Sequence, residues 1–123
     1  MMDNYQFFGS HKYIVAALTK NVDEMNYKLD NPEIKFYEFT DPIKFSKYIM
    51  ADFIYEIAEK CNADWLDDYE EQTLYPDTLP AAIEIVSGAI KQKKNADFKD
   101  YLEKTKELME IALANDTFME FLF

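Results

Sequence analysis

Residues 41–61 read DPIKFSKYIMADFIYEIAEKC and carry the clearest helix signal in the chain. Asp41 is a good N-cap, and Pro42 suits the first helical position because its missing N–H would have no partner there. The apolar side chains that follow would cover most of the helix circumference, and they are Ile43, Phe45, Tyr48, Ile49, Met50, Phe53, Ile54, Ile57 and Cys61. A helix this broadly apolar usually lies at the centre of a bundle. Residues 41–61 therefore predict one continuous central helix in an all-α fold.

The rest of the chain also follows mainly the 3.6-residue period of a helix. Apolar residues recur three and four positions apart over residues 10–29, although residues 13–18 alone are also compatible with a short buried strand. The helical period returns in two further stretches over residues 80–112. Residues 34–40 are aromatic and allow one short extended segment. We therefore predict a single compact domain over residues 1–123, an all-α helical bundle of four or five helices.

The chain is strongly acidic, with 24 acidic residues against 13 basic ones, all of them lysine, and a net charge of −11. Six of the acids and none of the lysines lie in residues 61–80, which therefore hold more than half of the net charge. Nucleic acid and anionic membranes would be repelled, so neither is an expected partner. The lone Cys61 fits a reducing compartment, and the longest apolar run is too short to cross a bilayer. A signal-peptide pattern is lacking as well, so we expect a cytoplasmic protein.

The same acidic segment holds the only tryptophan of the chain and two tyrosines. Carboxylates set among aromatic side chains are typical of protein interaction surfaces, because the rings anchor the partner while the charge steers and orients it. The predicted partner-binding residues are Asp64, Trp65, Asp67, Asp68, Tyr69, Glu70, Glu71, Tyr75 and Asp77. In the alternative interpretation, Trp65, Leu66 and Tyr69 complete the core of a short helix, and the acids are merely solvated around it.

Residues that support catalysis or metal binding are few. His11 is the only histidine and Cys61 the only cysteine, which is too few for a zinc or di-iron carboxylate site. Two glycines cannot build a phosphate-binding loop, and the acids of residues 61–80 lack the alternate spacing and central glycine of a calcium loop. We therefore predict that the protein is not an enzyme and has no catalytic residue, cofactor or metal.

These features favour a small acidic inhibitor that binds and neutralises a basic partner protein, such as a nuclease toxin or another nucleic-acid-binding effector. In size, acidity and its mixture of acids with tyrosines, the chain resembles bacterial immunity proteins and phage-encoded inhibitors. This resemblance is one of composition and transfers no site residue. The alternative is a structural or adaptor module that binds a partner helix, or a second copy of the chain, through an apolar surface. Its support is the tail Phe118–Phe123, in which five of six residues are apolar. Such a tail either docks onto the core, which is the more common outcome, or stays exposed as an interface.

Overall fold

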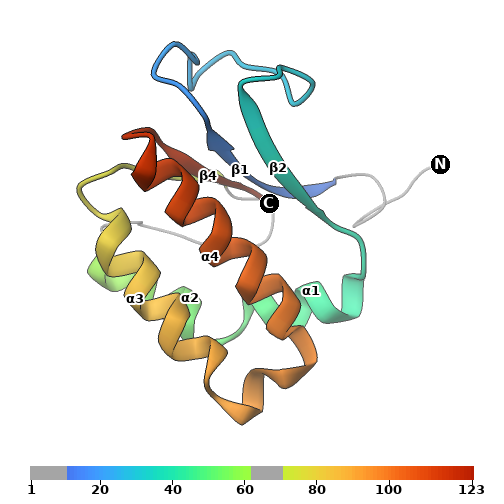
Figure 1. Cartoon of the computed structure of the whole chain (residues 1–123). Coiled ribbons are helices and arrows are strands. Elements are labelled where there is room, and N and C mark those ends of the chain that lie inside the picture. The colour runs from blue at the N-terminus through green and yellow to red at the C-terminus, as the bar shows by residue number, and fades with distance from the viewer. Residues whose placement is uncertain (1–10, 62–70) are drawn as a thin grey trace, which may run out of the picture.

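The computed structural model describes residues 11–61 and 71–123 (Figure 1). Within them the elements follow in the order β1 (Lys12–Ala17), β2 (Ile34–Phe39), α1 (Pro42–Ile49), α2 (Asp52–Lys60), β3 (Glu71–Leu74), α3 (Leu79–Ile90), the 3₁₀ helix η1 (Lys93–Phe98), α4 (Lys99–Ala114) and β4 (Met119–Leu122). The prediction of an all-α helical bundle is wrong, because the four strands form an antiparallel sheet. The extended segment expected at residues 34–40 is strand β2 of this sheet.

The C-terminal strand lies inside the sheet rather than at its edge. The strand order is β2-β1-β4-β3, so β4 pairs with β1 on one side and with β3 on the other. Ile14 on β1 lies opposite Phe121, and Val15 lies opposite Glu120. The last strand in the sequence therefore links the first strand to the third, and the sheet is complete only when the end of the chain has joined it.

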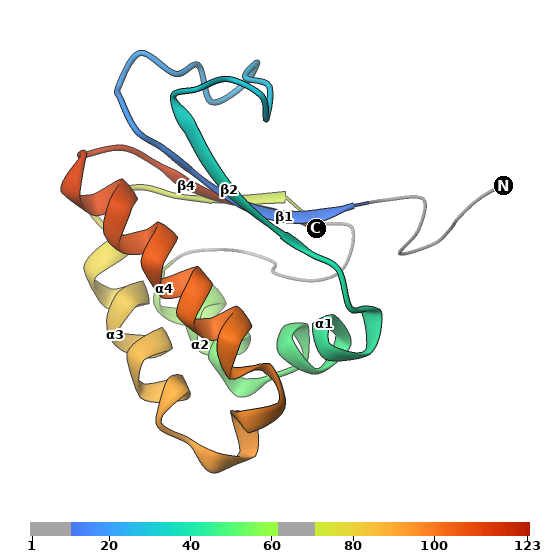
Figure 2. The same ribbon diagram turned by 45° about the vertical axis from the view of Figure 1, so that its right-hand side comes forward.

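The two faces of the sheet are covered by different parts of the chain. Figure 2 shows the helices gathered on one side of the sheet. Ile14 and Phe121 belong to the core on this helix side. Val15 and Phe118 belong to a second cluster on the opposite face, where side chains from residues 18–33 pack against them. Strand β1 is therefore buried from both sides, and the opposite face is covered by a loop instead of a helix.

This double burial explains why the predicted helix over residues 10–29 is wrong. A strand covered on one face alternates apolar and polar residues, whereas a strand covered on both faces reads as a continuous apolar run. Such a run cannot be distinguished from a buried helix by its periodicity. The alternative of a short buried strand at residues 13–18 matches β1, and residues 18–33 form turns that lead to β2.

The predicted central helix has the right start but is broken in the middle. The Asp41 side chain accepts hydrogen bonds from the backbone N–H groups of Ile43 and Lys44, both at 3.0 Å, and Pro42 opens α1 as predicted. Ala51 then adopts an extended conformation between α1 and α2. Because of this break, the apolar residues predicted for one helix do not share one face. Ile43 and Met50 are exposed, whereas Ile54 on α2 is buried.

The apolar tail Phe118–Phe123 forms part of the core. Met119 and Phe121 are fully buried on the helix side of β4, and Phe123 packs its ring against Phe45 with centroids 5.1 Å apart. The two helices predicted over residues 80–112 correspond to α3 and α4, with η1 between them. The tail therefore does not provide the exposed apolar surface that the adaptor hypothesis requires for binding a partner.

Tyr48 on α1 makes the stability of this core sensitive to alkaline pH. Its ring is fully buried, and its hydroxyl lies 2.8 Å from Oγ1 of Thr105, which itself donates to the carbonyl of Tyr101. Burial raises the pKa of Tyr48 above its ordinary value of 10.0, because the phenolate would be desolvated. The stabilisation from the neutral phenol is therefore complete below pH 10 and is lost as the pH rises further.

We expect Tyr48→Phe to lower the free energy of unfolding by about 1 kcal/mol at pH 7, because one buried hydrogen bond is lost. The same variant should lose less stability than the parent between pH 9 and pH 11, since it has no buried phenol to ionise. Urea unfolding at several pH values measures both effects. An equally steep decline in the two proteins would show that ionisation of Tyr48 does not limit alkaline stability.

Candidate functional site

The described structure contains only three of the nine predicted partner-binding residues. Asp64, Trp65, Asp67, Asp68, Tyr69 and Glu70 lie outside the described residues. Glu71 is the first residue of β3, while Tyr75 and Asp77 are exposed in the connection between β3 and α3. The acidic segment therefore enters the described structure at the edge of the sheet next to β4.

Tyr75 connects this segment to the turns after β1, which are distant from it in the sequence. Its hydroxyl donates a hydrogen bond to Oε2 of Glu24 at 2.6 Å, across 51 positions of sequence. This bond raises the pKa of Tyr75, because the neutral phenol supplies the proton that the carboxylate accepts. Glu24 lies in the turns after β1 and was not among the predicted site residues. The hydrogen bond therefore places Tyr75, near the end of the acidic segment, beside Glu24 in the turns after β1.

A second carboxylate, Glu120, projects from β4 on the face of the sheet opposite the helices. The residue is only 8% exposed, and its two oxygens accept hydrogen bonds from different elements. Oε1 accepts from the hydroxyl of Tyr27 at 2.6 Å, and Oε2 accepts from the hydroxyl of Thr73 on β3 at 3.2 Å. The Tyr27 ring in turn packs against Phe118. Both oxygens of Glu120 are thus held by side chains anchored elsewhere in the fold.

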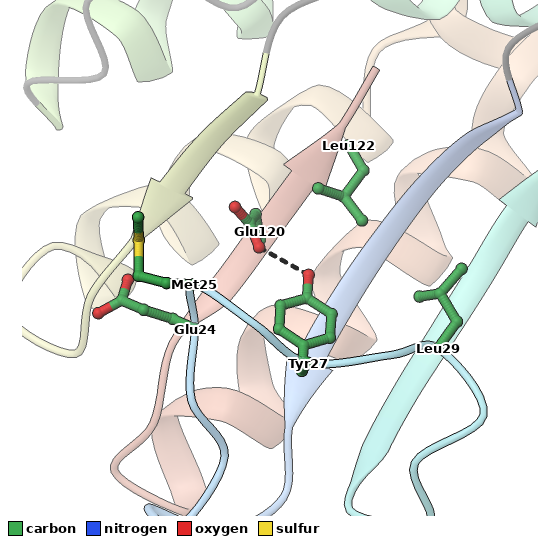
Figure 3. Close-up of a pocket in the computed structure, with 6 residues that line it drawn as sticks. All are labelled: Glu24, Met25, Tyr27, Leu29, Glu120 and Leu122. Carbon is green, nitrogen blue, oxygen red and sulfur yellow. Dashed lines mark hydrogen bonds between the residues drawn. The ribbon is translucent and has the colours of Figure 1, made fainter.

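Glu120 stands at the wall of a small cavity, which Figure 3 shows in close-up. The cavity has a volume of about 230 Å³ and is lined by Glu24, Met25, Tyr27, Leu29, Glu120 and Leu122. Pockets that hold drug-sized ligands or cofactors usually measure about 300–1,000 Å³. This cavity therefore suits one side chain of a partner better than a free small molecule. Met25 is 88% exposed, so an apolar side chain is accessible beside the two carboxylates.

A second hollow of about 210 Å³ adjoins the first and shares Glu24 with it. It lies between the turns after β1 and the connection after β3, and its lining includes Tyr75, Pro76 and Phe118. Lys20 and Asp116 form an exposed ion pair beside it, with Nζ and Oδ2 2.6 Å apart. We refer to the residues that line the two hollows as the loop-side surface.

Several acids of the helical layer are paired with lysines. On the helical layer, lysines form ion pairs with Asp97, Asp100 and Glu107. The adjacent lysine lowers the pKa of both Asp97 and Glu107. On the loop-side surface, Glu24 and Glu120 accept hydrogen bonds from hydroxyl groups, and Lys20 and Asp116 form an ion pair.

The residues considered for catalysis lie apart from the loop-side surface and from each other. His11 is exposed on β1's N-terminal side, and its Nδ1 lies 2.6 Å from Oε2 of Glu38 on β2. Cys61 is buried at the end of α2, and burial raises the pKa of its thiol, which makes it less reactive. Over residues 11–61 and 71–123, no group of three or more His, Cys, Asp or Glu side chains is placed to hold a metal ion.

Few features of the sequence pointed to Glu24 and Glu120 as site residues. Glu120 is the one acid within an apolar tail, and a single charge in an otherwise buried strand is a signal that it has a specific environment. Glu24 falls within the helix predicted over residues 10–29, which does not form. None of the described helices combines the length and apolarity that a bilayer crossing requires. No family model, curated protein or solved structure matches this chain.

Proposed function

We propose that this chain binds a basic partner protein through the loop-side surface together with the acidic segment at residues 61–80. The observation that carries the proposal is the hydrogen bond between Tyr75 and Glu24, which joins the end of that segment to the turns after β1. Tyr75, which belongs to the segment with the largest excess of negative charge, thereby lies on the same surface as Glu24. Exposed Met25 and Tyr75 supply apolar contact area within it.

The physical basis of the proposed interaction is charge complementarity. A protein that binds polyanions carries a basic cleft, and an acidic surface with aromatic anchors can occupy such a cleft after rapid, electrostatically steered association. Occupation of the cleft would exclude the polyanion, so binding would also inhibit the partner. A nuclease toxin or another nucleic-acid-binding effector fits this description.

The alternative function, an adaptor with an apolar surface, now depends on other residues. Phe118–Phe123 is built into the core, but Ile43 on α1, Met50 directly after α1 and Tyr55 on α2 are exposed. Salt separates the two functions. A complex held by charge weakens as salt screens it, whereas an apolar interface persists or tightens.

We expect the combined reversal of Asp67, Asp68 and Glu70 to lysine to weaken partner binding at least tenfold at low salt, chiefly through the association rate. The fold should survive, because removing like charges from a crowded acidic segment relieves repulsion. The measurement is capture from a lysate of the native host at low and high salt. A basic protein retained by the parent chain is then purified and titrated with each variant.

The matched control reverses Glu84, Glu103 and Glu110, which are exposed on α3 and α4. It changes the net charge by the same amount and leaves Glu107, which pairs with Lys35 and Lys104, intact. Equal loss of binding in both variants would mean that only the overall charge matters. Full binding by both variants would remove the acidic segment from the interface and favour the exposed apolar side chains of α1 and α2.

A further inference from the structure

We propose that strand β2 is a dimerisation edge, which pairs antiparallel with β2 of a second copy of the chain. β2 is the first strand in the order β2-β1-β4-β3, so only one of its sides meets another strand of the sheet. Each of its residues pairs in register with β1, without a bulge. A regular edge strand presents backbone donors and acceptors to a further strand. This inference does not rest on the proposed basic partner.

The hydrogen bonds of β1 identify the backbone groups of β2 that face outward. The N–H of Leu18 donates to the carbonyl of Glu33 at 2.8 Å, whereas the N–H of Ala17 donates to the carbonyl of Phe118 at 3.2 Å. Backbone bonds alternate in direction along an antiparallel strand, so even-numbered residues of β1 bond to β2 and odd-numbered ones to β4. In the observed register, the odd-numbered residues of β2 bond to β1, and the even-numbered ones face away from it.

Phe36 and Glu38 therefore direct their backbone N–H and C=O groups away from the sheet. Within residues 11–61 and 71–123, no turn or loop backbone group forms a hydrogen bond with either of them. The side chain of Phe36 is 44% exposed, and its ring packs edge-on against that of Tyr13 with centroids 5.7 Å apart. The outer side of β2 thus combines outward backbone groups with an exposed aromatic ring.

The charges along β2 suit a second copy better than a basic partner. Lys35 forms an ion pair with Glu107 on α4 at 3.0 Å, and Oε2 of Glu38 lies 2.6 Å from Nδ1 of His11. The strand itself contains one lysine and one glutamate, so its charges balance, although the whole chain carries −11. Such an edge neither attracts a basic strand nor strongly repels a copy of itself.

Symmetry restricts the register of this dimer. A two-fold axis perpendicular to the sheet brings residues with side chains on the same face opposite each other. With the axis at Phe36, the two Phe36 residues exchange backbone hydrogen bonds, and Glu38 of each copy lies opposite Ile34 of the other. No like charges are then directly opposite, and the Phe36 rings extend the contact with Tyr13 across the interface. An axis at Tyr37 would instead set the Glu38 carboxylate against the Phe36 ring.

The first test is sedimentation velocity of the full chain from about 1 µM to about 1 mM, because a small interface is expected to be weak. We expect a monomer at the low end and a dimer at the high end. Since salt screens the repulsion between two acidic chains, the dimer should tighten about threefold or more between about 50 mM and 500 mM salt. A monomer throughout, or a dimer that weakens with salt, would overturn the proposal. The complex with a basic partner has the opposite salt dependence, so the two proposals can fail separately.

Amide hydrogen exchange followed by NMR tests whether the dimer uses this edge. The amides of Phe36 and Glu38 should exchange about twofold more slowly when half of the chains are dimeric. Those of Lys35 and Tyr37 bond to β1 and should be protected at every concentration. Dimer formation without slower exchange at Phe36 would place the interface elsewhere and contradict the proposal.

Phe36→Lys should raise the dimer dissociation constant at least about tenfold, because it removes the ring pair and sets two ammonium groups opposite each other. The matched control is Tyr55→Lys on α2, where the parent side chain is 64% exposed and the charge change is the same. It should dimerise within about threefold of the parent. Equal dissociation constants for the two variants would overturn the proposal.

A disulfide tests the register without depending on a lysine at the interface. Opposite residues that exchange hydrogen bonds in an antiparallel pair have Cα atoms about 5.5 Å apart, within the span of a disulfide of about 4.4–6.8 Å. Phe36→Cys should therefore form a covalent dimer on mild oxidation. Glu38→Cys, which would lie opposite Ile34, and the parent, whose cysteine is the buried Cys61, should not. Equal cross-linking at positions 36 and 38, or none at position 36, would show that the proposed pairing is wrong.

Discussion

A chain that ends at Thr117 is expected to be unfolded at 25 °C. The truncation removes β4, whose backbone pairs with both β1 and β3, so the sheet would be divided. It also removes four buried apolar residues, namely Phe118, Met119, Phe121 and Phe123. Each buried side chain of this size contributes about 1.5–3 kcal/mol, and a whole domain is typically stable by only about 5–15 kcal/mol. The loss of these side chains, at about 6–12 kcal/mol, is therefore comparable with the whole stability of a typical domain, and the divided sheet adds to it.

Near-UV circular dichroism and the dispersion of amide NMR signals measure this outcome directly. Both should show loss of fixed tertiary structure in the truncated chain. A synthetic peptide of residues 117–123, added in excess, should restore part of the signal, because the vacant place between β1 and β3 is specific for it. Cooperative unfolding of the truncated chain at the urea midpoint of the parent would show that the tail is only an accessory to the core.

Ile54→Asp is the point substitution with the largest expected effect. Ile54 is 1% exposed and belongs to the core between the helices and the sheet. A carboxylate at this position would lose its hydration without gaining a cationic partner, and such substitutions belong to the most destabilising class known. We expect the free energy of unfolding to fall by at least about 4 kcal/mol, which should leave the chain partly or wholly unfolded.

Tyr55→Asp is the matched control for this variant. Tyr55 is the next residue of α2, is 64% exposed, and acquires the same new charge. Its free energy of unfolding should stay within about 0.5 kcal/mol of that of the parent, as is usual for surface substitutions. Urea unfolding of the three proteins provides the comparison. Similar losses in the two variants would contradict the packing of α2 described above.

Local signals predicted those parts of the fold that depend on local interactions. Asp41 and Pro42 begin α1 because an N-cap and a proline without an N–H act on neighbouring backbone groups only. The amphipathic pattern over residues 80–112 likewise found α3 and α4. The break at Ala51 escaped prediction, because apolar residues on both sides of it continue the helical spacing in the sequence.

The strands could not be assigned from the same kind of signal. Residues 12–17 and 119–122 pair with each other from opposite ends of the chain, and burial on both faces removes the alternation that identifies a strand. Their β-structure depends on hydrogen bonds to distant partners, which no local window contains. A helical interpretation of residues 10–29 followed for that reason, and Glu24 was placed on a helix that does not form.

The sequence by itself determined the charge of this protein: its excess of acids, the concentration of six of them in residues 61–80, and the absence of arginine. These properties follow from composition and hold in any fold. Only the tertiary structure decided that Glu24 meets Tyr75 and that Glu120 meets Tyr27 and Thr73, across 51, 93 and 47 positions of sequence. The physical reason is that these contacts form when β4 enters the sheet between β1 and β3, and burial of apolar side chains on both faces drives that step.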